Sequence, residues 1–381
     1  MALVINTNSS SLQAQNNLTK STSALAQATE RLSSGLKINS AKDNAAGYAI
    51  STRFSTQIGG LSQASSNASD AISLAQTTGS ALDEVTANLQ AIRDLAVQSA
   101  NGTYTDTDRA AIDTEVQQRL SEITRIANQT DFNGTKVLDG STSSLSFQVG
   151  ANVGQTISVA LGQGVRADQV GAIATSSTDD LSTLFASGAS VTLGSGDFSI
   201  ATGAGATSGT VDVTGTFANI QDLSDAINAS NSGVSAAVSS DGKKINLYSA
   251  TALDVTVGTG SGASGIATGG AISGAVSGSL SGGDVKTVDD ANALISRVDT
   301  SLTAVSNLAS NLGAIQNRFQ STISTLSAES ANLTSSQSTI QDADFAAETA
   351  NLSKAQVLQQ AGISVLSQAN SQPQQVLKLL Q

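Results

Sequence analysis

The chain has 381 residues, a net charge of −12, and no cysteine, histidine or tryptophan. The absence of cysteine excludes a disulfide framework and thiolate metal sites, and the absence of histidine removes the commonest general base and metal ligand. The negative charge disfavours nucleic acid as a partner, because binding to phosphates needs a concentrated basic face.

The hydropathy of the chain also excludes a membrane span. No stretch approaches the roughly 18 uninterrupted apolar residues of a spanning helix. The N-terminus has no basic residue before Lys20 and no apolar core followed by a cleavage site, so it does not predict a Sec-type signal peptide. We therefore expect no membrane insertion and, if the protein leaves the cell, another export route.

The N-terminal part, up to about residue 140, predicts helices with one short break. Leu18, Leu25 and Leu32 lie seven residues apart in a first helix. A second helix carries a heptad seam from Leu61 to Ser99, and Asn101-Gly102 marks its end. A third helix begins near residue 106 or 107, and its apolar face is Ile112, Val116, Leu120, Ile123 and Ala127.

The glycine-rich middle, from about 141 to 286, predicts β structure with some helix. Residues 145–149 and 157–161 alternate in hydropathy on either side of a glycine turn, which indicates a hairpin. Further strands are predicted near 191–193, 198–200, 234–238, 245–248 and 255–257, with a short helix at 220–227. Asp241-Gly242 is a strong turn signal. Residues 258–283 have low complexity and are interpreted as loop.

The C-terminal part repeats the heptad pattern. Apolar positions alternate at three and four residues from Val298 to Leu333, and a last helix continues the spacing from Leu352 to Ala369. An ordinary helical bundle would show the same periodicity. Long seams at both ends favour termini that pack against each other with the middle as an insertion. The fold class is therefore α+β: a long antiparallel coiled-coil helical rod from both termini, with a β-rich central outer domain.

The domain boundaries follow from these composition shifts. We expect terminal coiled-coil arms at 1–42 and 340–381, and a helical rod with a β-hairpin at 43–165 and 287–339. The β-rich, surface-exposed variable domain would span 166–286. The arm seams are diluted with serine, threonine and amides. We therefore expect the arms to be partly disordered in a monomer and to order on association.

Several strings at both ends resemble one family. They are MALVINTN at 1–8, ERLSSGLKINSAKDNAAG at 30–47, IANQTDFNGTKVL at 126–138, IQDADFAAETANLSK at 340–354, QQAG at 359–362, QAN at 368–370 and VLKLL at 376–380. In this order they are similar to the ends of bacterial flagellins. The resemblance covers about 140 N-terminal and 95 C-terminal residues, and residues 217–257 resemble, more weakly, an insert of flagellin outer domains.

The resemblance implies a structural subunit that polymerises into the flagellar filament for motility. The subunit would be exported unfolded by the flagellar type III apparatus and would be extracellular in the flagellum. The implied partners are itself, as a helical homopolymer, the flagellar cap and hook-junction proteins, a cytoplasmic flagellin chaperone, the type III export apparatus and innate immune receptors. The residues expected to pack in the filament core are Leu18, Leu25, Leu32, Leu352, Leu358 and Leu366.

The resemblance also implies two immune-recognition surfaces. The animal Toll-like receptor site corresponds to Gln90, Arg93, Leu95 and Glu115, although Ala91 stands where the family usually has an arginine. The segment recognised by plants corresponds to residues 30–51. There the matching residues are Ser40, Lys42, Asp43 and Gly47, and Asn44 replaces a common aspartate. Rod packing and solvation would also explain these residues.

The sequence offers no catalytic, metal or cofactor site, so we predict no enzyme and no cofactor. Asp342 and Asp344 are better explained as acids at a helix start than as a catalytic pair. The glycine pairs lack a P-loop lysine and are explained by hairpin turns. A hook–filament junction protein with the same terminal architecture is the alternative. A coiled-coil adhesin or phage-fibre protein would require a Sec signal, an anchoring domain or a trimeric repeat.

Overall fold

A computed structural model describes residues 8–203, 210–230, 232–258, 265–267 and 271–379. The first seven and last two residues of the predicted arms lie outside this set, as do parts of the 258–283 segment. The chain divides into two compact units, which are described separately. Unit 1 comprises Met1–Asn67, Gln148–Gln155 and Ser321–Gln381, and unit 2 comprises Ala68–Phe147 and Thr156–Gln320.

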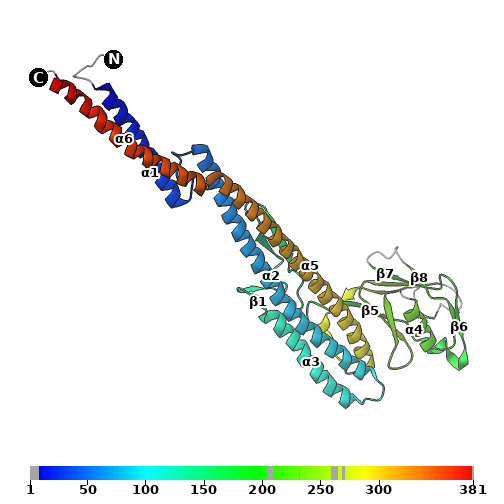
Figure 1. The fold of residues 1–381 in the computed structure, drawn as a ribbon. Helices are drawn as coiled ribbons and strands as arrows, with labels where there is room; N and C mark the ends of the chain where they lie inside the picture. The colour runs from blue at the N-terminus through cyan, green and yellow to red at the C-terminus, as the bar shows by residue number, and fades with distance from the viewer. Residues whose placement is uncertain (1–7, 204–209, 231, 259–264, 268–270, 380–381) are drawn as a thin grey trace. The chain divides into compact units, whose positions relative to one another are not determined.

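Long helices form both ends of the chain, as predicted. They are α1 (Ser9–Ser34), α2 (Ala45–Ala100), α3 (Asp106–Gln129), α5 (Val288–Gln341) and α6 (Phe345–Leu379). The predicted end of the second helix and start of the third are confirmed. Thr105 caps α3 through a capping box with Asp108, so the new helix begins where its first N–H groups find acceptors. In unit 1, α1 and α6 lie side by side (Figure 1).

The heptad seam of α2 is buried, which is why this helix packs against its neighbours. In unit 1, Leu61 and Ala64 of α2 pack with Leu326 of α5. In unit 2, the seam of α2 continues in fully or nearly fully buried positions. These are Ala68, Ala71, Ala75, Leu82, Val85, Leu89, Ile92 and Ala96. The small alanines let the helix axes approach closely while burying apolar area.

The predicted hairpin is confirmed as β3 (Ser144–Gln148) and β4 (Thr156–Ala160). A smaller hairpin, β1 (Asp131–Phe132) and β2 (Thr135–Lys136), follows α3. Phe147 of β3 meets the buried Phe319 of α5 edge to face, with ring centroids 5.8 Å apart and an interplanar angle of 84°. Within unit 2, this contact joins β3 to α5.

The central β region has two four-stranded sheets, ordered β10-β11-β5-β14 and β13-β12-β7-β8, and the pair β6-β9. The strands are β5 (Ile173–Ser177), β6 (Val191–Leu193), β7 (Phe198–Thr202), β8 (Val211–Asp212), β9 (Gly215–Phe217), β10 (Val234–Val238), β11 (Ile245–Ser249), β12 (Leu253–Val257), β13 (Ala271–Gly274) and β14 (Val276–Ser277). The helix α4 (Ile220–Ala229) places Leu223 and Ile227 in their common core. The predicted turn at Asp241-Gly242 is confirmed: β10 and β11 are antiparallel, and Gly242 has φ +70°.

The interpretation of 258–283 as loop was wrong in part. Among the described residues of that segment, β13 pairs with β12, and β14 pairs with β5. The glycine-rich sequences of β13 and β14 are too short to show an alternating apolar pattern. Whether they form strands depends on the neighbouring strands β12 and β5. The strand β5, which forms the centre of its sheet, was likewise not predicted.

The start of α5 is fastened by polar contacts within unit 2. Ser99 Oγ donates to the Val285 carbonyl over 2.6 Å, and the Val285 N–H donates to Asp113 Oδ1 over 3.2 Å. Asp289, in the first turn of α5, accepts hydrogen bonds from Ser240 and from the Asn246 amide of β11. The β region and α5 are thus connected by charge-assisted hydrogen bonds as well as by the chain.

Candidate functional site

The paired terminal helices α1 and α6 carry the first set of predicted functional residues. Asn8 caps α1 by accepting from the Ser11 N–H, and its amide donates to the Ala369 carbonyl over 2.9 Å. Buried Ser21 donates from Oγ to the Ala355 carbonyl over 3.0 Å. These bonds fix the register of α1 against α6, because each ties a side chain to one backbone group of the other helix.

The seam between these helices uses small residues where the backbones approach most closely. Ala14, Ala28 and Ala355 are buried, and a side chain added at Gly362 would lie 3.3 Å from Leu18 Cδ1. Most of the predicted core-packing leucines are half-buried in the single chain: Leu18, Leu25, Leu32, Leu352 and Leu366. Leu358 differs, since it is 51% exposed. Packing between copies stays a prediction for all of them.

Several large apolar side chains of the arms are exposed in the part of the chain that the structure describes. The exposed large apolar side chains of α1 and α6 are Leu12, Phe345, Val357, Leu358, Ile363 and Val365. Val357 is the most exposed of them, at 64%. Sequence reasoning named only Leu358 of this set, because it followed the heptad positions. Apolar residues that fall outside the heptad seam were the signal that it missed.

The non-helical segment that follows α1 and the one that precedes α6 lie side by side in unit 1. Gly35 ends α1 in the left-handed region, with φ +74°. Leu36 forms an antiparallel bridge with Asp342, and the Lys37 N–H donates to the Gln341 carbonyl over 2.7 Å. Ser51 of α2 also hydrogen-bonds the Gln341 side chain. The segment that follows α1 and the segment that precedes α6 are therefore cross-linked by hydrogen bonds.

The predicted plant-recognised segment lies beside this break and is largely ordered by its own side chains. Asp43 Oδ2 accepts from the Ser40 N–H over 3.0 Å and from the Asn39 N–H over 3.1 Å, and these bonds lower the pKa of the Asp43 carboxyl. Lys42 is exposed. Gly47 is buried, and a Cβ there would lie 2.5 Å from Ile38 Cδ1.

The predicted animal-receptor surface lies in unit 2. Gln90 is exposed, and Leu95 is half-buried. Arg93 Nε contacts Asp299 Oδ1 of α5 at 2.7 Å, and that hydrogen bond raises the pKa of the Arg93 guanidinium. Glu115 pairs instead with Arg119, one turn along α3, at 2.8 Å. No local pattern in the sequence predicts that Arg93 has this intramolecular partner, because Asp299 is distant along the chain.

The acids that resembled a catalytic pair have structural roles. Asp344 Oδ1 accepts from the N–H groups of Ala346 and Ala347, which is the capping predicted at the start of α6. Asp342 Oδ2 accepts from Ser338 Oγ over 2.6 Å. Within the described ranges, no three carboxylates gather as metal ligands, and no helix is long and apolar enough to cross a membrane.

Known proteins similar to this chain match it at both ends and along its length. The model of the bacterial flagellin N-terminal helical region matches residues 5–143, and that of the C-terminal helical region matches residues 295–380. The chain is 46% identical to a flagellin of Serratia marcescens and 37% identical to the B-type flagellin of Pseudomonas aeruginosa. Both alignments cover 100% of each chain.

A solved structure is also similar. The chain resembles FliC from Burkholderia pseudomallei, with 29% sequence identity and a TM-score of 0.41. The similarity covers 65% of this chain and 99% of that chain.

Proposed function

Because the chain belongs to the bacterial flagellin family, it is a structural subunit of the flagellar filament, and we propose that the exposed apolar side chains of its arms join the copies. One observation carries this proposal. The helices α1 and α6 already bury one face against each other, yet Val357, Ile363 and Val365 remain more than half exposed. A neighbouring copy that covered these side chains would bury apolar area on both chains.

Association would remove this surface from water, which stabilises the contact by roughly 25 cal/mol for each Å² of apolar area buried. A contact between different patches of identical subunits generates an open helical filament when the rotation between copies does not close into a ring. Leu358 is 51% exposed, so it belongs with these side chains. The half-buried leucines would support them from behind by holding α6 against α1.

The same arms would serve the partners met before assembly. A cytoplasmic chaperone would cover the exposed apolar side chains of α6, and the type III apparatus would export the chain unfolded to the outside of the cell. The absence of cysteine means that no disulfide has to be broken for threading. At the filament ends, the cap and hook-junction proteins would meet the surfaces that another subunit would otherwise cover.

The receptor surfaces are part of the proposal as well. Gln90, Arg93, Leu95 and Glu115 would form the animal-receptor contact, with Arg93 held by Asp299. An Asp299→Ala variant would release the guanidinium and change the affinity for the receptor, which surface plasmon resonance would measure.

In the plant-recognised segment, Ser40 and Asp43 share hydrogen bonds, so a receptor that needs an extended segment would have to break them.

Seeded polymerisation tests the proposed function. Purified monomer is mixed with filament fragments and viewed by negative-stain electron microscopy, beside a chain that ends at Asp344 and lacks α6. We expect long filaments from the full chain and none from the truncation. A Val357→Asp variant should assemble poorly. The control is Lys354→Asp, which changes the charge at an exposed polar position of α6, and we expect it to assemble better than Val357→Asp. Short rings from the full chain would favour the junction-protein alternative.

A further inference from the structure

The tip of the β3–β4 hairpin holds an apolar side chain fully in water. Val153, between two strands of a short hairpin, is 104% exposed. The tip around it is ordered by amide side chains: Gln148 Nε2 donates to the Asn152 carbonyl over 2.6 Å, and the Asn152 N–H donates to Gln155 Oε1 over 2.9 Å. Asn67 of α2 donates to the Gln148 carbonyl over 2.9 Å. The Val153 knob is therefore presented in a fixed position, and docking would cost little ordering entropy.

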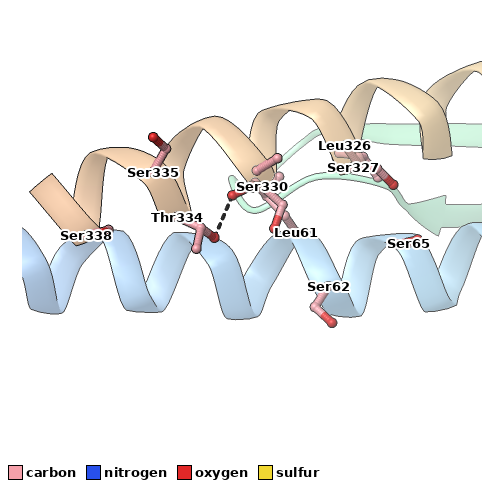
Figure 2. A pocket seen from close by; sticks show the side chains of 10 residues that line it. Leu61, Ser62, Ser65, Leu326, Ser327, Ser330, Thr334, Ser335 and Ser338 are labelled. Carbon is pink, nitrogen blue, oxygen red and sulfur yellow. Dashed lines mark hydrogen bonds between the residues drawn. The ribbon is translucent and has the colours of Figure 1, made fainter. Parts of the chain in front are cut away.

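A groove of about 670 Å³ lies between α2 and α5 in the same unit. Figure 2 shows Leu61 between the two helices and hydroxyl side chains along both of them, and Leu326 of α5 also lines the groove. Both leucines are almost fully buried, so the groove has an apolar floor. Its rims carry Ser62, Ser330 and Thr334, which are too small to close over that floor.

The knob and the groove belong to the same turns of α2. A side chain at Gly60 would lie 3.0 Å from the Cβ of Ala151 in the hairpin tip, and the next residue, Leu61, lines the groove. Since Val153 is fully exposed, it does not fill the groove of its own chain. Unit 1 thus carries both the exposed Val153 and the groove on neighbouring turns, and Val153 does not fill the groove of its own chain.

The charges favour a second copy as the occupant. The chain has a net charge of −12, so most surfaces of two copies repel each other. The groove residues and the tip residues 150–155 include no charged side chain. Bringing these two surfaces together avoids like-charge repulsion and covers apolar atoms on both sides.

We propose that Val153 of each subunit docks into the α2–α5 groove of a neighbouring copy, with its side chain on Leu61 and Leu326. This inference rests on the filament function and names one of its contacts. The contact joins two different patches, so it can repeat from copy to copy, as a filament requires. It is separate from the arm contact, since it uses no residue of α1 or α6.

Cross-linking tests the contact directly, because the chain has no cysteine of its own. Filaments of a Val153→Cys, Ser330→Cys variant are treated with a short bis-maleimide and analysed by denaturing electrophoresis. The matched control pairs Val153→Cys with Ser336→Cys, an exposed serine of α5 that does not line the groove. We expect a ladder of covalent multimers from the first pair and none from the control. An equal ladder from both pairs, or none from either, overturns the contact.

A charge at the knob gives a second readout. Val153→Asp should raise the critical concentration for seeded growth about tenfold or more, and Val153→Ala should raise it less. Circular dichroism of the monomer should not change, because the side chain touches nothing within its own chain. Filament growth of Val153→Asp at the unaltered critical concentration would refute the docking and leave the filament function intact. Failure of the unaltered chain to form filaments would instead overturn the filament function.

Discussion

Two phenylalanines of this chain allow the contributions to folding and to assembly to be tested separately. Phe319 of α5 is fully buried and meets Phe147 edge to face at 5.8 Å, whereas Phe345 at the start of α6 is 62% exposed. Phe319→Ala removes a buried ring, which typically costs about 3–5 kcal/mol of unfolding free energy. The aromatic pair contributes about 0.5–1.5 kcal/mol of that loss. Phe345→Ala should cost the monomer within about 0.5 kcal/mol, as for other surface positions.

Urea unfolding of the monomer, followed by circular dichroism, measures both variants. A double-mutant cycle with Phe147→Leu isolates the ring pair, because each single variant removes the edge-to-face contact. Seeded polymerisation is then measured under conditions where both monomers are folded. We expect Phe345→Ala to slow assembly although its monomer stability is unchanged.

The outcome that would refute this reasoning is specific. If Phe345→Ala lowers the unfolding free energy as much as Phe319→Ala does, then Phe345 is buried within the monomer and is not free to contact another copy. If Phe319→Ala costs less than about 1 kcal/mol, the site has collapsed around the missing ring, and the hairpin is not anchored by that contact.

Further predictions concern backbone conformation and ionisation. Gly171→Ala should destabilise the monomer by about 1–3 kcal/mol in urea unfolding, because φ is +76° and the new Cβ would lie 3.1 Å from the Arg297 carbonyl. Gly313→Ala, in α5 with open space around it, should instead stabilise the monomer by about 0.5–1 kcal/mol; a loss would contradict the described helix. Burial, with the nearby charge of Asp289, raises the pKa of Tyr248 to about 12, above its usual 10.0. The neutral phenol is thus favoured in the folded state, so its contribution to stability is complete below pH 10 and declines as the pH rises towards 12. Ultraviolet titration should show one tyrosine that ionises at a higher pH than the others, and Tyr248→Phe should remove that step.

Local patterns in the sequence determined most of the helical architecture. Heptad spacing predicted the buried positions of α2, and Asn101-Gly102 predicted the end of that helix, because these signals depend on residues within a few turns of one another. The turn at Asp241-Gly242 was predictable for the same reason. The capping role of Asp344 followed from its place at a helix start.

Only the tertiary structure decided which surfaces remain free. The heptads of α1 and α6 show that each helix has an apolar seam. They do not show whether Leu18 or Leu358 packs against its own chain or against another copy. The strands β13 and β14 form because β12 and β5 offer them unpaired backbone groups, and a glycine-rich segment contains no local sign of such neighbours. The exposure of Val153 and the ion pair between Arg93 and Asp299 likewise depend on residues distant in the sequence. Periodicity reports the apolar face of an element, whereas its partner is set by packing across the whole fold.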